Sequence, residues 1–324
     1  MKFDRCWSRV IFPYQDPPNS RLQLNWETEE KDPALQEVVL PNGLNVFAHD
    51  KGETELIYEE IWTYDSYFQC DKLKLEPGAT VLDVGGNTGL FSLYAKQDKC
   101  NNDATIYAFE PIPSTYRILK ANGDRHFDAE QGNAKFHALN YGLSSKDGEI
   151  TFWHHPHQCG WTTSDKEMDE KRNQDLYQNL PTITDEIVKK PENWWLRWFP
   201  RSLVLWGARQ FAHAMVKTQP ITCQVRTLSS VIDEYKISNI DLVKVDVEGA
   251  ELDVLQGIRD DHWPRIQQFT MEVEGHTLKP IQQLLTEKGF VFEHEYVHKV
   301  QQAFFGVEAE IFYLWAWRQT AQDK

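Results

Sequence analysis

Apolar and polar residues follow two different periods along most of the chain. Short apolar runs that end at a polar residue predict buried strands, and apolar residues three and four apart predict helices between them. Repeated strand–helix units, followed by two strands without a helix between them, indicate an α/β fold with a seven-stranded, mostly parallel sheet and an antiparallel C-terminal hairpin. The predicted strands are residues 80–84, 105–110, 135–140, 149–153, 241–246, 267–273, 290–297 and 309–317. The predicted helices are residues 55–70, 89–97, 113–122, 227–235, 250–257 and 277–288.

Two segments interrupt this alternation. Residues 1–54 are rich in proline and polar residues, and Pro41-Asn-Gly43 within them predicts a hairpin turn. We interpret this segment as an N-terminal extension that lies over the core. Residues 154–219 are too long for an ordinary loop. We interpret them as a helical, aromatic insertion that forms a lid, which leaves residues 55–153 and 220–324 as the core.

The second half of this insertion is both aromatic and basic. The run Trp194-Trp-Leu-Arg-Trp-Phe-Pro-Arg-Ser-Leu-Val-Leu-Trp206 contains four tryptophans, and residues 189–217 contain six basic residues and one acid. The positive charge predicts an acidic partner, either a carboxylated or phosphorylated substrate or an acyl or peptidyl carrier protein. Two alternatives are a local helical core, in place or at a homodimer interface, and peripheral attachment to a membrane.

Composition narrows the classes of function. The chain has 324 residues and a formal net charge of −15, which argues against nucleic acid as a partner. Its five cysteines are scattered without a C-x-x-C pair, which predicts reduced thiols, no zinc site and a cytoplasmic location. The N-terminus does not resemble a signal peptide, and no stretch approaches the ~20 apolar residues of a membrane span. We therefore expect a soluble protein without stable membrane insertion.

A glycine turn follows the first predicted core strand. The strand 80–84 carries Asp83 near its end, and Gly85, Gly86 and Gly89 follow it at the start of a helix. Glycines allow positive φ and a close approach of the backbone to a ligand, and the helix N-terminus offers free N–H groups. The spacing does not fit G-x-G-x-x-G, the dinucleotide fingerprint. The turn therefore favours a nucleoside with an amino-acid tail over a pyrophosphate.

Further polar residues lie at the ends of neighbouring predicted strands. Glu110 ends the second strand, where a carboxylate is positioned to accept hydrogen bonds from two ribose hydroxyls. Asn140 ends the third strand and, with Tyr141, is a candidate for adenine recognition. Asp246 ends a later strand. Because parallel strands present their carboxyl ends at one edge of a sheet, we expect these acids to lie close together.

Three motifs together resemble the FkbM family of S-adenosylmethionine-dependent methyltransferases. They are Asp83-Val-Gly-Gly-Asn-Thr-Gly89, Phe109-Glu-Pro111 and Val243-Lys-Val-Asp-Val-Glu-Gly-Ala-Glu251. The resemblance implies a class I (Rossmann-like) methyltransferase fold with S-adenosyl-L-methionine as cofactor. It also implies methylation of a small molecule, most often on oxygen: a hydroxyl or carboxylate of a polyketide, peptide or sugar, free or held on a carrier protein. N-methylation and nucleoside binding without catalysis are the alternatives. The cofactor-binding residues that we expect are Asp83, Gly85, Gly86, Asn87, Gly89, Glu110, Asn140, Tyr141 and Asp246.

A second polar cluster is expected on the acceptor side. Lys244 and Asp246 share one face of a strand, and a lysine in a buried strand needs an acidic partner. In the functional interpretation, Lys244, Asp246 and Glu272 orient or deprotonate the acceptor. The alternative is a buried ion pair that only stiffens the sheet edge. His276, just after the next strand, is a candidate general base because its ordinary pKa suits proton removal at neutral pH.

The start of the insertion and the turn after Asp246 complete the predicted acceptor site. The run His154-His-Pro-His-Gln-Cys-Gly-Trp-Thr-Thr163 holds three histidines and a cysteine, but their spacing matches no standard zinc site. Asp246 with Glu272 or Glu274 could hold a hard divalent cation through oxygens, but no ligand pattern for one is recognisable, and we predict no metal ion. We expect Trp161, Thr162 and Glu248 to contact the acceptor, with His155 as a second-choice base.

Overall fold

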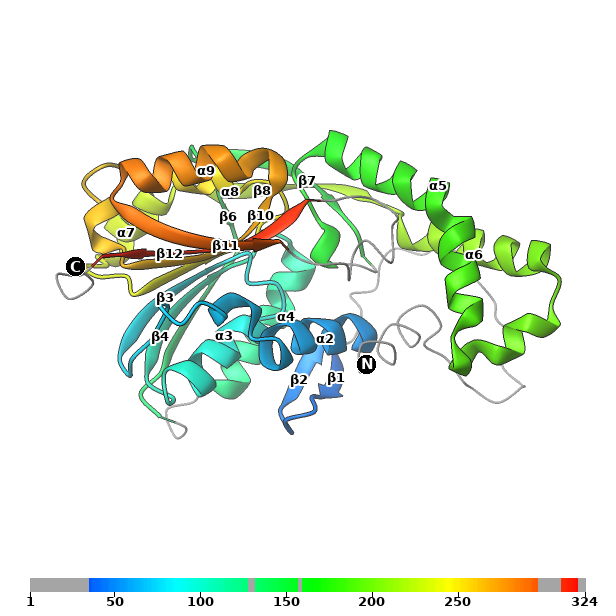
Figure 1. The fold of residues 1–324 in the computed structure, drawn as a ribbon. Helices are drawn as coiled ribbons and strands as arrows, with labels where there is room; N and C mark the ends of the chain where they lie inside the picture. Colours follow the sequence, from blue (N-terminus) through cyan, green and yellow to red (C-terminus); the bar gives the residue numbers. More distant parts are fainter. Residues whose placement is uncertain (1–34, 128–131, 157–158, 297–309, 320–324) are drawn as a thin grey trace.

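A seven-stranded sheet forms the centre of the molecule (Figure 1). The computed structural model describes residues 35–127, 132–156, 159–296 and 310–319. The strands are β3 (Ala79–Val84), β4 (Ala104–Phe109), β5 (Lys135–Leu139), β9 (Leu242–Val245), β10 (Gln268–Glu274), β11 (Phe290–Tyr296) and β12 (Ile311–Arg318). Their order is β11-β12-β10-β9-β3-β4-β5. Neighbours from β10 to β5 are parallel, and β12 is antiparallel to both β10 and β11, so the predicted sheet and its C-terminal hairpin are confirmed.

Helices cover both faces of this sheet (Figure 1). They are α3 (Leu90–Tyr94), α4 (Pro113–His126), α7 (Leu228–Tyr235), α8 (Glu251–Gln256) and α9 (Gly275–Glu287). Successive strand residues point to opposite faces, so Val81 packs in the cluster beneath α3 and Leu82 in the cluster beneath α7, α8 and α9. Both faces of β3 and β9 are buried, which explains why these strands read as continuous apolar runs.

A hairpin and a helical segment precede the core. β1 (Gln36–Val39) and β2 (Asn45–Ala48) pair antiparallel around the predicted Pro-Asn-Gly turn. The side chain of Asn122 on α4 accepts a hydrogen bond from Phe47 N and donates one to Phe47 O, which fixes the hairpin to the core. The chain continues through α2 (Lys51–Tyr58), a π-helical turn and a short 3₁₀ turn, so the helical segment predicted over residues 55–70 forms in three pieces. The remainder of the predicted N-terminal extension lies outside the described residues.

A second, three-stranded sheet corrects the sequence interpretation. β6 (Gly142–Leu143), β7 (Gly148–His154) and β8 (Gln219–Arg226) pair in the order β6-β8-β7. β7 matches the predicted strand at 149–153, but it is outside the main sheet. β8 was not predicted, because its antiparallel partner lies on the other side of the insertion in sequence.

The insertion is helical and projects from the core (Figure 1). It contains α5 (Lys166–Lys189), a 3₁₀ segment η6 (Pro191–Trp198) and α6 (Arg201–Met215). The Asp165 side chain caps α5 by accepting from the N–H groups of Glu167 and Met168. Leu176, Leu180 and Ile183 on α5 pack against Ala212 on α6, so the two helices share a small core of their own.

Candidate active site

A cavity of about 490 Å³ lies between the carboxyl edge of the sheet and the insertion. The ends of β3, β4, β9 and β10 contribute Gly85, Glu110, Asp246 and Glu272 to its floor. The insertion contributes apolar side chains to the opposite wall. These are Leu176, Leu180, Ile183, Ile187, Leu196, Val204, Ala208, Phe211 and Ala212. The cavity therefore has a polar half made by the core and an apolar half made by the insertion.

The glycine turn brings the backbone of β3 against that of β9. A Cβ atom at Gly85, whose φ is +79°, would lie 1.8 Å from Asp246 O, so only glycine fits there. Gly89, with φ +89°, caps α3. Asn87 also has positive φ, and its Oδ1 is buried at the cavity without a hydrogen-bond partner among the described residues. Such an acceptor is available to a ligand donor.

Glu110 is held beside this turn by backbone N–H groups. Its Oε1 accepts from Ile112 N at 2.9 Å, and its Oε2 accepts from Asn87 N at 3.2 Å. Burial raises the pKa of Glu110 to about 8, although both backbone bonds act in the opposite direction. Each oxygen retains acceptor capacity toward the cavity, which Glu110 also lines.

Lys244 lies under the turn and joins two strand ends. Its Nζ donates to Gly85 O at 2.7 Å and lies 3.4 Å from Asp83 Oδ1 and 3.3 Å from Asp246 Oδ2. Burial lowers the pKa of Lys244, but Asp246 and Asp83 outweigh burial and leave this pKa raised. Asp83 also accepts from Ser92 Oγ at 2.7 Å and does not line the cavity. The predicted contact of Asp83 with a ligand is therefore replaced by a contact with Lys244.

Tyr67 and Glu60 belong to the floor and were missed by the sequence analysis. Tyr67 OH donates to Asp246 Oδ2 at 2.9 Å, and Tyr313 OH donates to Glu60 Oε1 at 2.6 Å. Both Tyr67 and Glu60 lie in the segment 55–70 before β3, which is rich in tyrosine and tryptophan. Most of the core sequence separates this segment from Asp246. The abundance of tyrosine and tryptophan there was the available signal, but it did not indicate which strand the segment covers.

Acidic side chains are in large excess around the cavity. Among its described lining residues they are Glu53, Glu59, Glu60, Glu110, Asp246, Glu248, Glu272 and Glu295. Lys244 is the single lysine or arginine among the described lining residues. Burial, followed by repulsion from Asp246 and Glu60, raises the pKa of Glu272 well above its ordinary value. This excess of carboxyl groups around the cavity favours a cationic ligand.

The start of the insertion closes one side of the cavity. Trp161 and Thr162 line it, as predicted for acceptor contacts. Glu248, which also lines it, accepts from Arg172 Nη2 of α5 at 2.9 Å, and Arg172 Nη1 donates to Trp161 O at 3.2 Å. Arg172, which was not singled out from the sequence, thus ties the insertion to the turn after β9.

Besides Asp83 and Gly89, four predicted site residues are not among the described residues that line the cavity: Asn140, Tyr141, His155 and His276. Asn140 Nδ2 donates to the carbonyls of Glu110 and Pro111, so Asn140 holds the turn after β4, and the Tyr141 ring packs against Phe109 and Arg226. His155 is buried under Trp161 and bonded to Asp169 of α5 at 2.7 Å.

His276 is 63% exposed in the first turn of α9, beside Glu274. α9 begins directly after β10, and His276 is not among the described residues that line the cavity. Neither His276 nor His155 is therefore retained as a base.

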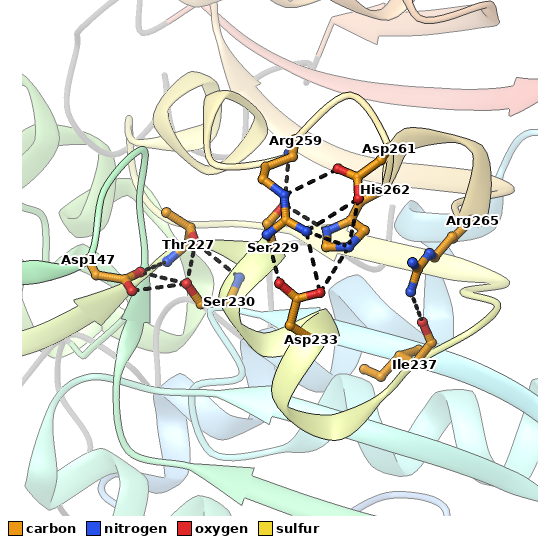
Figure 2. Close-up of polar contacts among 10 residues, drawn as sticks. All are labelled: Asp147, Thr227, Ser229, Ser230, Asp233, Ile237, Arg259, Asp261, His262 and Arg265. Carbon is orange, nitrogen blue, oxygen red and sulfur yellow. Dashed lines mark hydrogen bonds and ion pairs between the residues drawn. The ribbon is translucent and has the colours of Figure 1, made fainter.

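A second polar cluster lies at the ends of α7 and α8, away from the cavity (Figure 2). Arg259 pairs with Asp233 and Asp261, and His262 Nδ1 shares a hydrogen bond of 2.9 Å with Ser229 Oγ. Serine, histidine and aspartate also meet in hydrolases, but Ser229 is buried and its Oγ already accepts from Arg259 N. This cluster joins two helix ends and has no reactive serine.

The fold and the cavity define a class I methyltransferase. The family model for the methyltransferase FkbM domain matches residues 83–293, and the chain belongs to this family of S-adenosylmethionine-dependent methyltransferases. It is 32% identical over 264 residues to methyltransferase sdnD of Sordaria araneosa, which covers 78% of this chain and 88% of that protein. It is 30% identical over 251 residues to 31-O-demethyl-FK506 methyltransferase FkbM of Streptomyces tacrolimicus. This match covers 72% of this chain and 80% of that protein.

A third relative is a much longer protein. The chain is 31% identical over 245 residues to the AMB antimetabolite synthetase AmbE of Pseudomonas aeruginosa, which covers 76% of this chain and 11% of AmbE. The cofactor of this chain is S-adenosylmethionine. The acidic cavity, which residues 85–88 of the glycine turn also line, fits its cationic sulfonium and its nucleoside.

Proposed function

We propose that the protein transfers the methyl group of S-adenosylmethionine to a hydroxyl oxygen of a small-molecule natural product. The observation that carries this proposal is the excess of carboxyl groups lining the cavity around Asp246 and Glu272, next to the glycine turn. S-adenosylmethionine supplies an activated methyl group when bound. The sequence expectation included carboxylate acceptors, but an anionic acceptor would be repelled by this floor, so the hydroxyl is favoured.

The residues at the floor have distinct roles in this proposal. Glu110 and the backbone of residues 85–87 hold the nucleoside, and Lys244 with Tyr67 fixes the orientation of Asp246. Asp246 accepts the proton that the acceptor hydroxyl releases as its oxygen bonds to the methyl carbon, while the bond between that carbon and sulfur breaks and leaves S-adenosylhomocysteine. The apolar half of the cavity excludes water from this step.

The relatives support the acceptor class. One is named for O-methylation of an FK506 precursor and another as an antimetabolite synthetase, which suits an acceptor that is free or held on a carrier protein. N-methylation of a similar molecule is the second candidate function, because the acidic floor would also attract an amine.

Methyl transfer to matched hydroxyl and amine acceptors, read by mass spectrometry, tests the proposal. We expect product with the hydroxyl series, and an Asp246→Asn variant with kcat lowered about 100-fold and S-adenosylhomocysteine affinity within about tenfold of wild type. Asp233→Asn, in the distant cluster of Figure 2, is the matched control and should leave both values unchanged. Transfer to amines alone, or full activity of the Asp246→Asn variant, would contradict this assignment.

A further inference from the structure

The outer face of the insertion exposes an unusual number of large apolar side chains. Among the described residues, the exposed large hydrophobic side chains are Val39, Tyr177, Trp194, Trp195, Trp198, Phe199, Leu203 and Trp206. All except Val39 belong to the insertion. Trp198 is 79% exposed and Trp206 is 61% exposed, which is far above what a tryptophan packed in a local core would retain. The sequence alternative of a local aromatic core is therefore not what this face forms.

Helix α6 carries apolar side chains on two of its sides. On α6, Leu203 and Trp206 are three residues apart and therefore lie on the same side of the helix, open to solvent. Val204, Ala208 and Phe211 of the same helix line the cavity. Leu203 and Trp206 therefore form a second apolar patch on α6, outside the cavity and open to solvent.

Positive charge surrounds this apolar face. Residues 189–217 contain six basic residues and one acid, a formal charge of +5 on a chain of −15. Arg201 is compensated by Asp185, with Nη2 to Oδ2 at 2.8 Å. Arg197 donates only to the carbonyls of Val188 and Lys189, and Arg209 is exposed, so both positive charges remain available. A partner that complements this face has an anionic surface and an apolar interior that the exposed aromatic side chains can enter.

We propose that the outer face of η6 and α6 docks on an anionic lipid surface. Indole rings occupy the boundary between headgroups and acyl chains, and lysine and arginine beside them pair with anionic headgroups. No helix in the described part of the chain is long and apolar enough to cross a membrane, so the contact is peripheral. Because α6 lines the cavity with its other side, docking brings the apolar half of the cavity close to the lipid.

Vesicle co-sedimentation of the full chain tests the proposal. Vesicles of phosphatidylcholine alone are compared with vesicles of phosphatidylcholine and phosphatidylserine, at low and high salt. We expect binding to the mixed vesicles that weakens with salt, and loss of at least about tenfold in binding for the double variant Trp198→Ser, Trp206→Ser. Lys189→Gln with Arg209→Gln should weaken binding to the mixed vesicles and leave any binding to phosphatidylcholine unchanged.

Val39→Ser is the matched control, because Val39 is equally exposed and lies outside the insertion. Binding of S-adenosylhomocysteine should be normal in every variant, so a failed cofactor assignment is read separately from a failed docking assignment. Absence of binding to mixed vesicles overturns the proposal. A dimer in sedimentation velocity that the tryptophan variant dissociates also overturns it, because the face would then cover a second copy of the chain.

Discussion

The polar cluster at the cavity floor and the cluster of Figure 2 use similar residues with different charge balance. At the floor, Lys244 faces Asp83 and Asp246 and is the one described lysine or arginine among eight acidic lining residues. In Figure 2, the exposed Arg259 and the buried His262 share Asp233 and Asp261, which are exposed. Hydrogen bonds from Arg259 lower the pKa of Asp233, whereas burial raises the pKa of Glu272. The floor, with one lysine among many carboxyl groups, leaves carboxyl groups for a ligand, whereas both carboxylates of the second cluster are paired with Arg259 and hold the helices together.

Removing the cation of each cluster should therefore change the stability of the protein by unequal amounts. We expect the largest change for Lys244→Met. This variant leaves Asp83 buried without its partner, so we expect the free energy of unfolding to fall by about 3–5 kcal/mol in urea titrations. Adding Asp83→Asn should recover part of the loss. A Lys244→Met protein as stable as wild type would contradict the assignment of Lys244 as the cation that the buried Asp83 needs.

Glu110→Ala tests whether the floor carboxyls bind the cofactor. Losing the hydrogen bonds to a ribose should weaken S-adenosylhomocysteine binding about 100-fold in isothermal titration. NAD should bind neither protein, and Asp261→Ala in the cluster of Figure 2 serves as the control. Normal binding by the Glu110→Ala protein would mean that the nucleoside lies elsewhere.

Stability against pH separates buried carboxyls from exposed ones. Burial raises the pKa of Glu53 to about 7 and those of Glu110 and Glu251 to about 8. Between their unfolded pKa near 4.5 and these folded values, the folded protein holds more protons than the unfolded one. Its stability should therefore fall as pH rises from about 5 to 8, by at most about 1.4 kcal/mol per carboxyl and pH unit.

S-adenosylmethionine carries the positive charge that the ionised carboxyls need. Its affinity should rise over the same pH interval, and by more than that of S-adenosylhomocysteine, which lacks the sulfonium. Melting curves with and without each ligand measure both effects. Equal pH dependence for the two ligands would place the sulfonium away from the acids.

Arg259→Gln should have the smallest effect. The guanidinium lies at the surface, where water and salt screen its pairs with Asp233 and Asp261. We expect methyl transfer at the wild-type rate and a melting temperature slightly below that of wild type. This difference in melting temperature between the variant and wild type should be smaller in high salt. A loss of activity in this variant would break the distinction between the two clusters.

The strand ends were predictable because local patterns define them. An apolar run, a carboxylate and a glycine turn are adjacent in sequence, so Gly85, Glu110 and Asp246 could be assigned to one sheet edge from their order along the chain. β8 was not predictable in the same way, because β7, its partner, lies on the far side of the whole insertion. His276 shows the opposite error: its sequence position suggested the sheet edge, but α9 begins at once and carries the ring into solvent.

The chain's sequence by itself determined the core strands and helices, the glycine turn and the methyltransferase family, since each depends on runs of residues adjacent along the chain. Tertiary structure alone decided that Tyr67 bonds Asp246, that Arg172 ties the insertion to Glu248, and that the tryptophans face outward. Side-chain direction and long-range pairing depend on how separate elements pack. A local pattern can assign a residue to a strand or helix, but only the packed neighbours determine which atoms it meets.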